Sequence, residues 1–296
     1  YQYLHRPEVA RIWYGGRNGW HKAKEVFGYT LKTKLPEFRD ALWYADGTKL
    51  NFFNRNGKLN ANLMVYEVID AYSEVLLGYH ISAQENFEAQ YNAFRMAIQF
   101  AGQKPYEIRY DNQGGHKKVK NFLDSLSKVG FFTQPYNGKS KTIESIFGRF
   151  QAKHMKTAWN FTGQNITAVK LDSHANIEFI SKNLKHLPDE NEVIQQYIQM
   201  RNAWNNDIHP KYGKPRIQLY LESINPHAEP LDELAMIELF WIPKEEERIY
   251  TNEGIWLEHS KTKLLYEVKL PNGDPDTQFR EDFRHQPYII KYDPLC

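Results

Sequence analysis

Cysteine is nearly absent from the sequence, which limits the kinds of site that the chain can build. The 296 residues contain one cysteine, Cys296. A single thiol excludes an internal disulfide and a thiolate-rich zinc site, and it favours a reducing compartment. Long apolar runs are also missing, since none approaches the roughly 20 residues that span a bilayer, and no signal peptide precedes the first motif. We therefore expect an intracellular protein with no membrane partner.

A strong excess of charge of either sign is missing as well. The net charge is +2, which alone does not indicate a nucleic-acid partner. Its distribution is uneven: residues 241–296 carry eight Lys and Arg against eleven Asp and Glu, which leaves 30 basic and 25 acidic residues in the first 240. Between Lys139 and Lys156, five basic side chains accompany one acid, Glu144. A patch of this kind is often plain solvated surface, so it needs a second observation before it indicates DNA.

The chain divides into four segments of different pattern. Residues 1–37, with GGRNGW as a loop, show no clear period and are interpreted as a lead-in segment. Residues 38–222 form an α/β core, and residues 223–240 a polar linker that contains proline. Residues 241–296 are a run of short strands separated by turns, which is typical of a small all-β barrel. Because the sequence begins at Tyr1 rather than Met, we expect it to be a piece of a longer protein.

Strand patterns open the core, and helical patterns follow them. The expected strands are 42–53, 61–70, 75–82, 106–111 and 130–134, and the expected helices follow the third, fourth and fifth of these. The first three strands are joined by short turns and form an antiparallel meander. The order β-β-β-α-β-α-β-α predicts a mixed five-stranded sheet flanked by helices.

Three acids stand at similar places in this order. Asp46 lies within the first strand, Asp111 closes the fourth, and Glu144 opens the helix after the fifth. Strands one and four of such a sheet are commonly neighbours, and the helix after strand five can pack across their ends. Three carboxylates brought together repel one another unless a cation joins them. Hard oxygen ligands suit Mg²⁺, and two such ions support an in-line phosphoryl displacement.

Basic and amide side chains surround the three acids, and they would hold a phosphodiester backbone without reading its sequence. Gly148, one helical turn beyond Glu144, leaves room for a bulky substrate. The predicted DNA contacts are Lys139, Lys141, Arg149, Lys153, Asn112 and His116.

Each acid, taken singly, also has an ordinary structural explanation. Asp46 could be a solvated edge residue, Asp111 a turn former at a strand end, and Glu144 an acid that favours the helix dipole. Asp70, in VIDAYSE, is a fourth acid, and its usual role before a tight turn is to cap that turn.

The ordered set of motifs resembles a known family. WYADGT, YDNQGG and PYNGKSKTIESIFGRF resemble the catalytic core of the DDE transposases and retroviral integrases, and GKSKTIESIF is most similar to the phage Mu transposase branch. YIQMRNAWNNDIHPKYGKPRIQLYLE is similar to the segment that follows the integrase core. The tail, with YTNEGIWLEHSKTKLLYEV and IIKYDP, resembles the small β-barrel of Mu-type transposases. The resemblance covers roughly residues 38–296.

The resemblance implies an RNase H-like fold and a catalytic, metal-binding triad of Asp46, Asp111 and Glu144. It implies two Mg²⁺ ions, with Mn²⁺ as a substitute, and DNA 3′-end cleavage followed by strand transfer. The implied partners are DNA (transposon ends and target), further copies of the chain in a multimer on DNA, and an ATPase that selects targets. Such a protein would be cytoplasmic and nucleoid-associated, and the helix-turn-helix domains that precede the core in relatives are not visible here.

Two departures from the family pattern and two alternative functions stay open. A basic residue commonly stands seven positions after the glutamate, where this chain has Gln151, and the usual Asp-Asn-Gly is Asp111-Asn112-Gln113-Gly114 here. One alternative is an RNase H-like nuclease or resolvase that only hydrolyses DNA. The other is a domesticated DNA-binding scaffold without chemistry.

Overall fold

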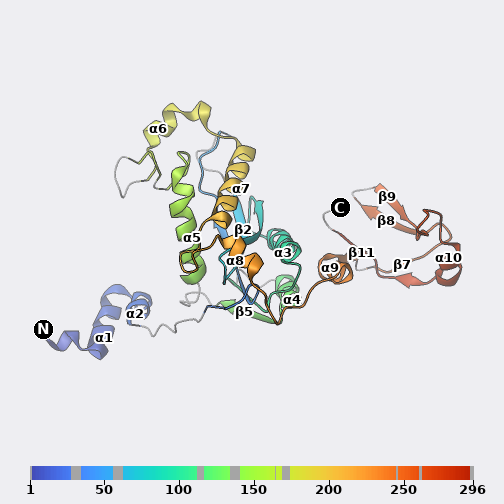
Figure 1. Ribbon diagram of the computed structural model, residues 1–296, viewed down its shortest axis with the longest axis horizontal. Helices are drawn as coiled ribbons and strands as arrows, with labels where there is room; N and C mark the ends of the chain where they lie inside the picture. Colours follow the sequence, from blue (N-terminus) through green and yellow to red (C-terminus); the bar gives the residue numbers. More distant parts are fainter. Residues whose placement is uncertain are drawn as a thin grey trace. The chain divides into compact units, whose positions relative to one another are not determined.

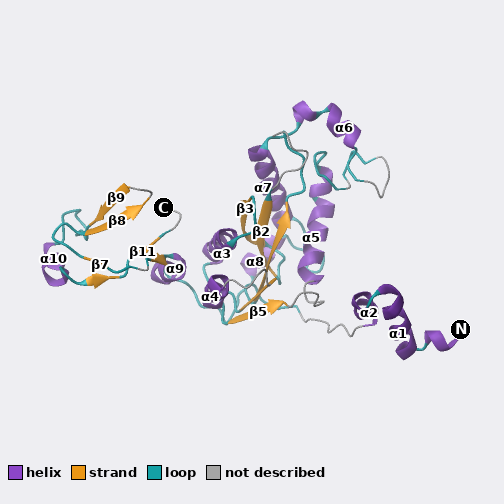
Figure 2. Cartoon of the chain, turned by 180° about the vertical axis from the view of Figure 1, so that it is seen from behind, coloured by secondary structure: helices purple, strands orange, loops and turns teal. Residues whose placement is uncertain are grey.

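The chain forms two compact units, Tyr1–Pro230 and Leu231–Cys296, in the computed structural model (Figure 1). The structure describes residues 2–27, 35–55, 63–111, 117–133, 141–163, 165–168, 174–244, 246–259 and 262–293. Figure 2 shows that the first unit combines helices with a sheet, and that the second contains short strands and short helices.

The N-terminal segment contains helices where the sequence analysis expected a loop. After the 3₁₀ turn η1 (Gln2–His5) come α1 (Pro7–Asn18) and α2 (Trp20–Phe27). The interpretation of GGRNGW as a loop is therefore wrong, because most of it lies inside these two helices. Gly15 has a packing role, because a Cβ at this position would lie 2.7 Å from a ring carbon of Trp20. Gly19, with φ 89°, makes the break between the helices.

A mixed sheet organises the first unit. Its strands are β1 (Leu42–Lys49), β2 (Met64–Asp70), β3 (Leu76–Ser82), β4 (Glu107–Asp111) and β5 (Val129–Thr133). They lie in the order β3-β2-β1-β4-β5. The pairs β1/β2 and β2/β3 are antiparallel, whereas β4 runs parallel to both β1 and β5. The predicted mixed α/β sheet is confirmed, and it is consistent with an RNase H-like core.

Three helices follow β3, β4 and β5 in the predicted order. They are α3 (Phe87–Ala101), α4 (Lys117–Leu126) and α5 (Lys141–Lys153). The helix α3 begins where the Asn86 side chain accepts a hydrogen bond from the Ala89 amide, and it ends at Gly102, whose φ of 68° suits glycine. The strand predicted over 42–53 is shorter than expected, because β1 ends at Lys49.

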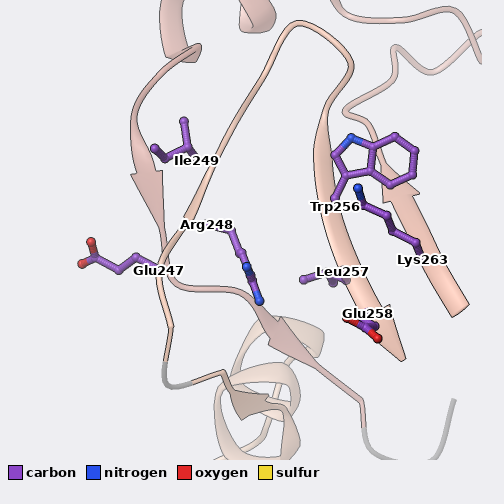
Figure 3. A pocket seen from close by; sticks show the side chains of 7 residues that line it. All are labelled: Glu247, Arg248, Ile249, Trp256, Leu257, Glu258 and Lys263. Atoms are coloured by element: carbon purple, nitrogen blue, oxygen red, sulfur yellow. The ribbon is translucent and has the colours of Figure 1, made fainter. Parts of the chain in front are cut away.

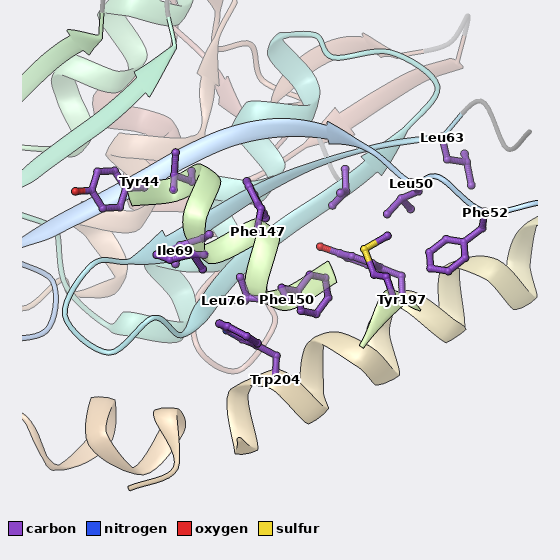
Figure 4. Close-up of a cluster of buried hydrophobic side chains, with 14 of the residues drawn as sticks. Tyr44, Leu50, Phe52, Leu63, Ile69, Leu76, Phe147, Phe150, Tyr197 and Trp204 are labelled. Atoms are coloured by element: carbon purple, nitrogen blue, oxygen red, sulfur yellow. The ribbon is translucent and has the colours of Figure 1, made fainter. Parts of the chain in front are cut away.

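The two faces of the sheet carry different helices, and Figure 1 shows α3 and α5 on opposite sides of the strands. A Cβ on Gly78 of β3 would lie 2.2 Å from the carbonyl oxygen of Ala93, so glycine lets α3 approach closely. The other face carries the main buried cluster, which α5 and α7 (Glu190–Asn206) cover. Figure 4 shows this cluster, which includes Tyr44, Ile69, Leu76, Phe147, Phe150, Tyr197 and Trp204.

The 3₁₀ turn η2 (Met155–Thr157) follows α5. The helical pattern over 163–222 predicted the further helices of the first unit, which are α6 (Ile177–Lys182), the 3₁₀ turn η3 (Leu184–His186), α7 and α8 (Arg216–Glu222). The long helix α7 starts with a capping box, in which Asp189 and Glu192 each accept from the backbone amide of the other.

The second unit consists of short elements. They are α9 (Glu233–Phe240), β6 (Ile242–Pro243), β7 (Arg248–Ile249), β8 (Ile255–His259), β9 (Thr262–Tyr266), α10 (Thr277–Phe283), β10 (Pro287–Tyr288) and β11 (Lys291–Tyr292). Among the described residues the strands pair as three two-stranded ladders, β10 with β7, β11 with β6 and β8 with β9. The predicted barrel is therefore not confirmed.

The sequence analysis expected an all-β tail, but the tail also contains the helix α10. The Asp276 side chain caps α10 by accepting from the Phe279 amide. Phe279 and Phe283, four residues apart, bring their rings to 4.6 Å on one face of this helix. The Phe279 ring then packs against Tyr250 at 5.5 Å. No helix among the described residues has the length and apolar character needed to cross a bilayer.

Candidate active site

Asp46 lies in the middle of β1, on the sheet face that α5 and α7 cover. Tyr44, two residues earlier, belongs to the buried cluster on that face, and alternate residues of a strand share a face. The partner of Asp46 on β2 is Glu67, whose carboxylate binds side chains of α7, so the cross-strand pair places both residues on this face. Asp46 is half-buried, and its Oδ1 accepts a hydrogen bond of 2.9 Å from the Gly47 amide.

Asp111 is the last residue of β4, the parallel neighbour of β1. The register pairs Ala45 with Tyr110, so positions 46 and 111 follow one step beyond this pair. On its other side, Asp111 pairs with Thr133 of β5. Two of the three predicted acids thus occupy adjacent positions on neighbouring strands. The side chain of Asp111 lies outside the described part of the structure, as do Asn112 and His116.

Glu144 lies in the first turn of α5 and is exposed. The helix is fixed to the sheet by Ile143, Ile146, Phe147 and Phe150, all of which are buried in the main cluster. A Cβ built on Gly148, one turn after Glu144, meets no atom of the described residues within 4 Å. Among the described residues, nothing therefore covers this face of α5. Lys139 and the side chain of Lys141 lie outside the described residues.

The donor types at positions 46, 111 and 144 are those that Mg²⁺ prefers, because each is a carboxylate. No group of three or more His, Cys, Asp or Glu side chains that could hold a metal ion occurs among the described residues. The side chain of Asp111 is not among those described residues. The strand register of positions 46 and 111 and the carboxylate donors are consistent with a site for a divalent ion. That Asp46, Asp111 and Glu144 are its ligands stays a prediction.

Arg149 and Lys153, both predicted as DNA contacts, are engaged with carboxylates of the chain itself. Arg149 donates to both oxygens of Glu74, with Nη1 2.9 Å from Oε2 and Nη2 2.5 Å from Oε1. Lys153 Nζ lies 2.8 Å from Oδ1 of Asp207, whose other oxygen lies 2.6 Å from Nε2 of His154. Both cations are partly exposed, at 39% and 54% of their side-chain area. They link α5 to the turn before β3 and to the residue that follows α7.

Glu74 makes charged contacts with α5 and α8 that the sequence analysis did not predict. It stands in the turn between β2 and β3 with φ 60°, and its carboxylate is 12% exposed. Besides Arg149 it receives Arg216 of α8, with Nη2 3.2 Å from Oε2, and it lies 3.6 Å from His209. Burial raises the pKa of this carboxyl, but the hydrogen bonds from His209 and Arg149 outweigh burial and lower it to about 2. Glu74 is therefore a buried carboxylate that remains charged.

A second buried group, centred on Glu67, was also missed. Tyr197 donates to Oε2 of Glu67 at 2.7 Å, and Arg201 donates to Oε1 at 2.7 Å. Both charged side chains are almost completely buried. Burial raises the pKa of Glu67, while Arg201 and Tyr197 act in the opposite direction. The sequence signal for this group was the charged residue Glu67 inside the apolar strand MVYEVID. The alternation of side chains along a strand does not show which partner such a residue has.

Asp70 caps the turn after β2, as its position before AYSE predicted. Its Oδ2 accepts from the amide and the hydroxyl of Ser73, at 2.8 Å and 2.6 Å, and its Oδ1 accepts from the Asp40 amide at 2.8 Å. Burial, reinforced by Asp40, raises the pKa of Asp70 to about 7. The residue pairs with Trp43 on the face opposite to that of Asp46. Its contacts are those of a structural residue.

The second unit contains a pocket of about 430 Å³. It is lined by Glu247, Arg248, Ile249, Trp256, Leu257, Glu258 and Lys263 (Figure 3). Lys263 Nζ lies 4.6 Å from the centre of the Trp256 ring. Two acids and two bases line the pocket with apolar side chains between them, so its lining has no carboxylate group comparable to the predicted triad.

Comparison with protein-family models and with curated proteins gives no match. Among solved structures, the chain is similar to one from a simian T-cell lymphotropic virus intasome in complex with the PP2A regulatory subunit B56 gamma (TM-score 0.44, 14% identity, 86% of this chain and 87% of that one). It is also similar to the HTLV-2 integrase catalytic core domain in complex with magnesium (TM-score 0.40, 14% identity, 62% of this chain and 98% of that one). A third similar structure is the catalytic core domain of BIV integrase (TM-score 0.40, 13% identity, 62% of this chain and 95% of that one).

Proposed function

We propose that the chain is the catalytic part of a DDE-type polynucleotidyl transferase, which cleaves DNA at a 3′ end and joins that end to a second DNA. One observation carries the proposal: Asp46 and position 111 are adjacent in register on parallel strands, on the face where α5 carries Glu144. This juxtaposition agrees with the roles that the DDE resemblance of WYADGT, YDNQGG and the α5 motif gives these acids. Mu-type specificity and a β-barrel tail belong to the same proposal.

The proposed site uses the three carboxylates to bind divalent metal and to place it against a scissile phosphate. Mg²⁺, when bound, would stabilise the attacking and leaving oxygens of an in-line displacement. The sheet brings Asp46 and position 111 together, and α5 would supply Glu144 from a side that leaves room for DNA. DNA is the proposed partner, and multimer formation on DNA follows from the family resemblance.

Supplying two different nucleophiles to the full chain separates transfer from hydrolysis. With Mg²⁺ or Mn²⁺, a labelled DNA duplex with recessed 3′-hydroxyl ends should be joined to a second duplex, and an uncut duplex should be nicked by water. Nicking without joining would favour the nuclease or resolvase alternative. Binding of DNA without either product, under conditions where the chain is folded, would favour the scaffold alternative.

The open position at Gly148 gives a test of where DNA approaches. Gly148→Ala should raise the free energy of unfolding by about 1 kcal/mol, because glycine is a poor helix former and the new methyl group meets no atom. Gly148→Leu should also fold, but its side chain would occupy the DNA approach beside Glu144. We expect a roughly tenfold loss of DNA cleavage in the leucine variant, since small displacements of substrate are costly.

The matched control is Gln199→Leu, at an exposed position of another helix, α7. It adds a comparable apolar side chain away from α5 and should cleave DNA at the wild-type rate. Wild-type cleavage by Gly148→Leu would show that DNA does not approach this face.

A further inference from the structure

We infer that Glu74 is a positioning residue for the active site, which fixes the rotation of α5 and hence the place of Glu144; this rests on the proposed function. The helix has two charged contacts on the side away from its open face. Arg149 is held by Glu74, and Lys153, one turn later, is held by Asp207. Because residues four apart share a helix face, both contacts restrain the same side of α5.

Because α5 is a regular helix, fixing the side on which Arg149 lies also fixes the direction in which Glu144 points. Arg149 stands five positions after Glu144 on the helix, which amounts to a net rotation of about 140° and a rise of about 7.5 Å. Apolar packing of Phe147 and Phe150 holds the helix on the sheet, but it tolerates small rotations better than a bidentate ion pair does. The Arg149–Glu74 pair therefore sets the direction in which the Glu144 side of α5 faces.

Glu74 is itself held rigidly, as a positioning residue must be. Its carboxylate receives Arg216 and Arg149 together, and its carbonyl oxygen accepts a 2.9 Å hydrogen bond from Nε1 of Trp204. The Arg216 guanidinium lies 3.6 Å from the centre of the Trp204 ring. The turn keeps a non-glycine residue in the left-handed region, which costs on the order of 1 kcal/mol. These side-chain contacts offset that strain and define one orientation of the carboxylate.

Two roles for Arg149 make opposite predictions when Glu74 is changed. If Arg149 mainly contacts phosphate, Glu74→Gln releases its guanidinium, and DNA binding tightens with full activity. If Arg149 mainly orients α5, the same change leaves DNA binding in place but displaces Glu144. The second role is the one that the bidentate geometry supports, because both guanidinium Nη atoms are already directed at Glu74.

The test measures three quantities on the full chain carrying Glu74→Gln. We expect the metal-free Kd for a DNA duplex to be unchanged or lower, and the cleavage rate to fall roughly 10- to 100-fold. The Mg²⁺ concentration for half-maximal cleavage should rise about tenfold, as it does when partners that orient metal ligands are removed. A purely structural role would lower the unfolding temperature without changing the Mg²⁺ requirement. Wild-type cleavage with an unchanged Mg²⁺ requirement would overturn the inference.

A second variant covers the case in which Glu74→Gln does not fold. Arg149→Lys keeps the positive charge for DNA but cannot form the bidentate pair. We expect the same loss of cleavage and the same rise in Mg²⁺ requirement, and no additional loss in the double variant, since both changes break one contact. Arg149→Lys with wild-type cleavage would overturn the inference by itself.

Controls separate this inference from the proposed function. Glu222→Gln removes an exposed carboxylate at the end of α8, which pairs with Lys214 ahead of that helix, and it should behave as wild type. If Asp46→Asn and Glu144→Gln abolish cleavage while Glu74→Gln and Arg149→Lys are fully active, only the positioning role of Glu74 is wrong. If Asp46→Asn and Glu144→Gln retain cleavage, the proposed active site itself is wrong.

Discussion

Asp46→Asn, Asp111→Asn and Glu144→Gln are each expected to abolish DNA cleavage and strand joining while DNA binding at low salt survives. Each change keeps the size of the side chain and removes one anionic oxygen ligand, so the site loses affinity for divalent metal. Metal catalysis contributes several kcal/mol to phosphoryl transfer, and 1.36 kcal/mol corresponds to a factor of ten. We therefore expect a loss of roughly a thousandfold or more in rate for each variant.

The matched control is Glu178→Gln. Glu178 is an exposed helical glutamate that pairs with Lys182 on α6, so it reproduces the charge change away from the sheet ends. It should cleave and join DNA as the wild type does. Normal strand joining by any one of the three site variants would refute the assignment of that residue, and normal joining by all three would refute the triad.

Arg201→Met is expected to have the largest effect on stability. Arg201 and Glu67 are almost completely buried, and they link α7 to β2 directly opposite Asp46. Removal of the cation leaves a buried carboxylate with Tyr197 as its one remaining donor among the contacts described above, and such losses cost about 3–5 kcal/mol. Chemical unfolding followed by tryptophan fluorescence measures the change.

The pH dependence of this loss has a defined sign. Burial already raises the pKa of Glu67 above its usual 4.5, and loss of Arg201 raises it further. The folded variant then binds a proton that the unfolded chain releases, so its stability increases as pH falls toward about 5. The destabilisation should therefore grow as the pH rises above the usual pKa of glutamate. The double variant Glu67→Met/Arg201→Met should recover much of the loss, and a double variant as unstable as Arg201→Met would contradict the account.

The sheet and its flanking helices could be predicted because their signals are local. Helical spacing from Phe87 to Ala101, with Asn86 before it and Gly102 after it, contains the whole of α3. The adjacency of β1 and β4, and with it the approach of positions 46 and 111, followed from the order of strands and helices. The same reasoning predicted the turn-capping role of Asp70.

The charged contacts behind α5 could not be predicted, because their partners are distant in sequence. Glu74 meets Arg149 and Arg216, 75 and 142 residues away, and no periodicity links such positions. Arg149 was instead grouped with the DNA contacts because it lies near other cations. The helices in the N-terminal segment were missed because Gly15 and Gly16 are usually helix breakers, whereas here Gly15 makes room for the Trp20 ring.

Diffraction from crystals of the full chain soaked with Mn²⁺ tests the central claim most directly. The account predicts anomalous density where β4 ends beside Asp46 of β1, with carboxylate oxygens of Asp46 and Asp111 about 2.1 Å from the ion and Glu144 facing the same site. Metal bound elsewhere, with the Asp46 and Asp111 carboxylates on opposite faces of the sheet, would contradict it.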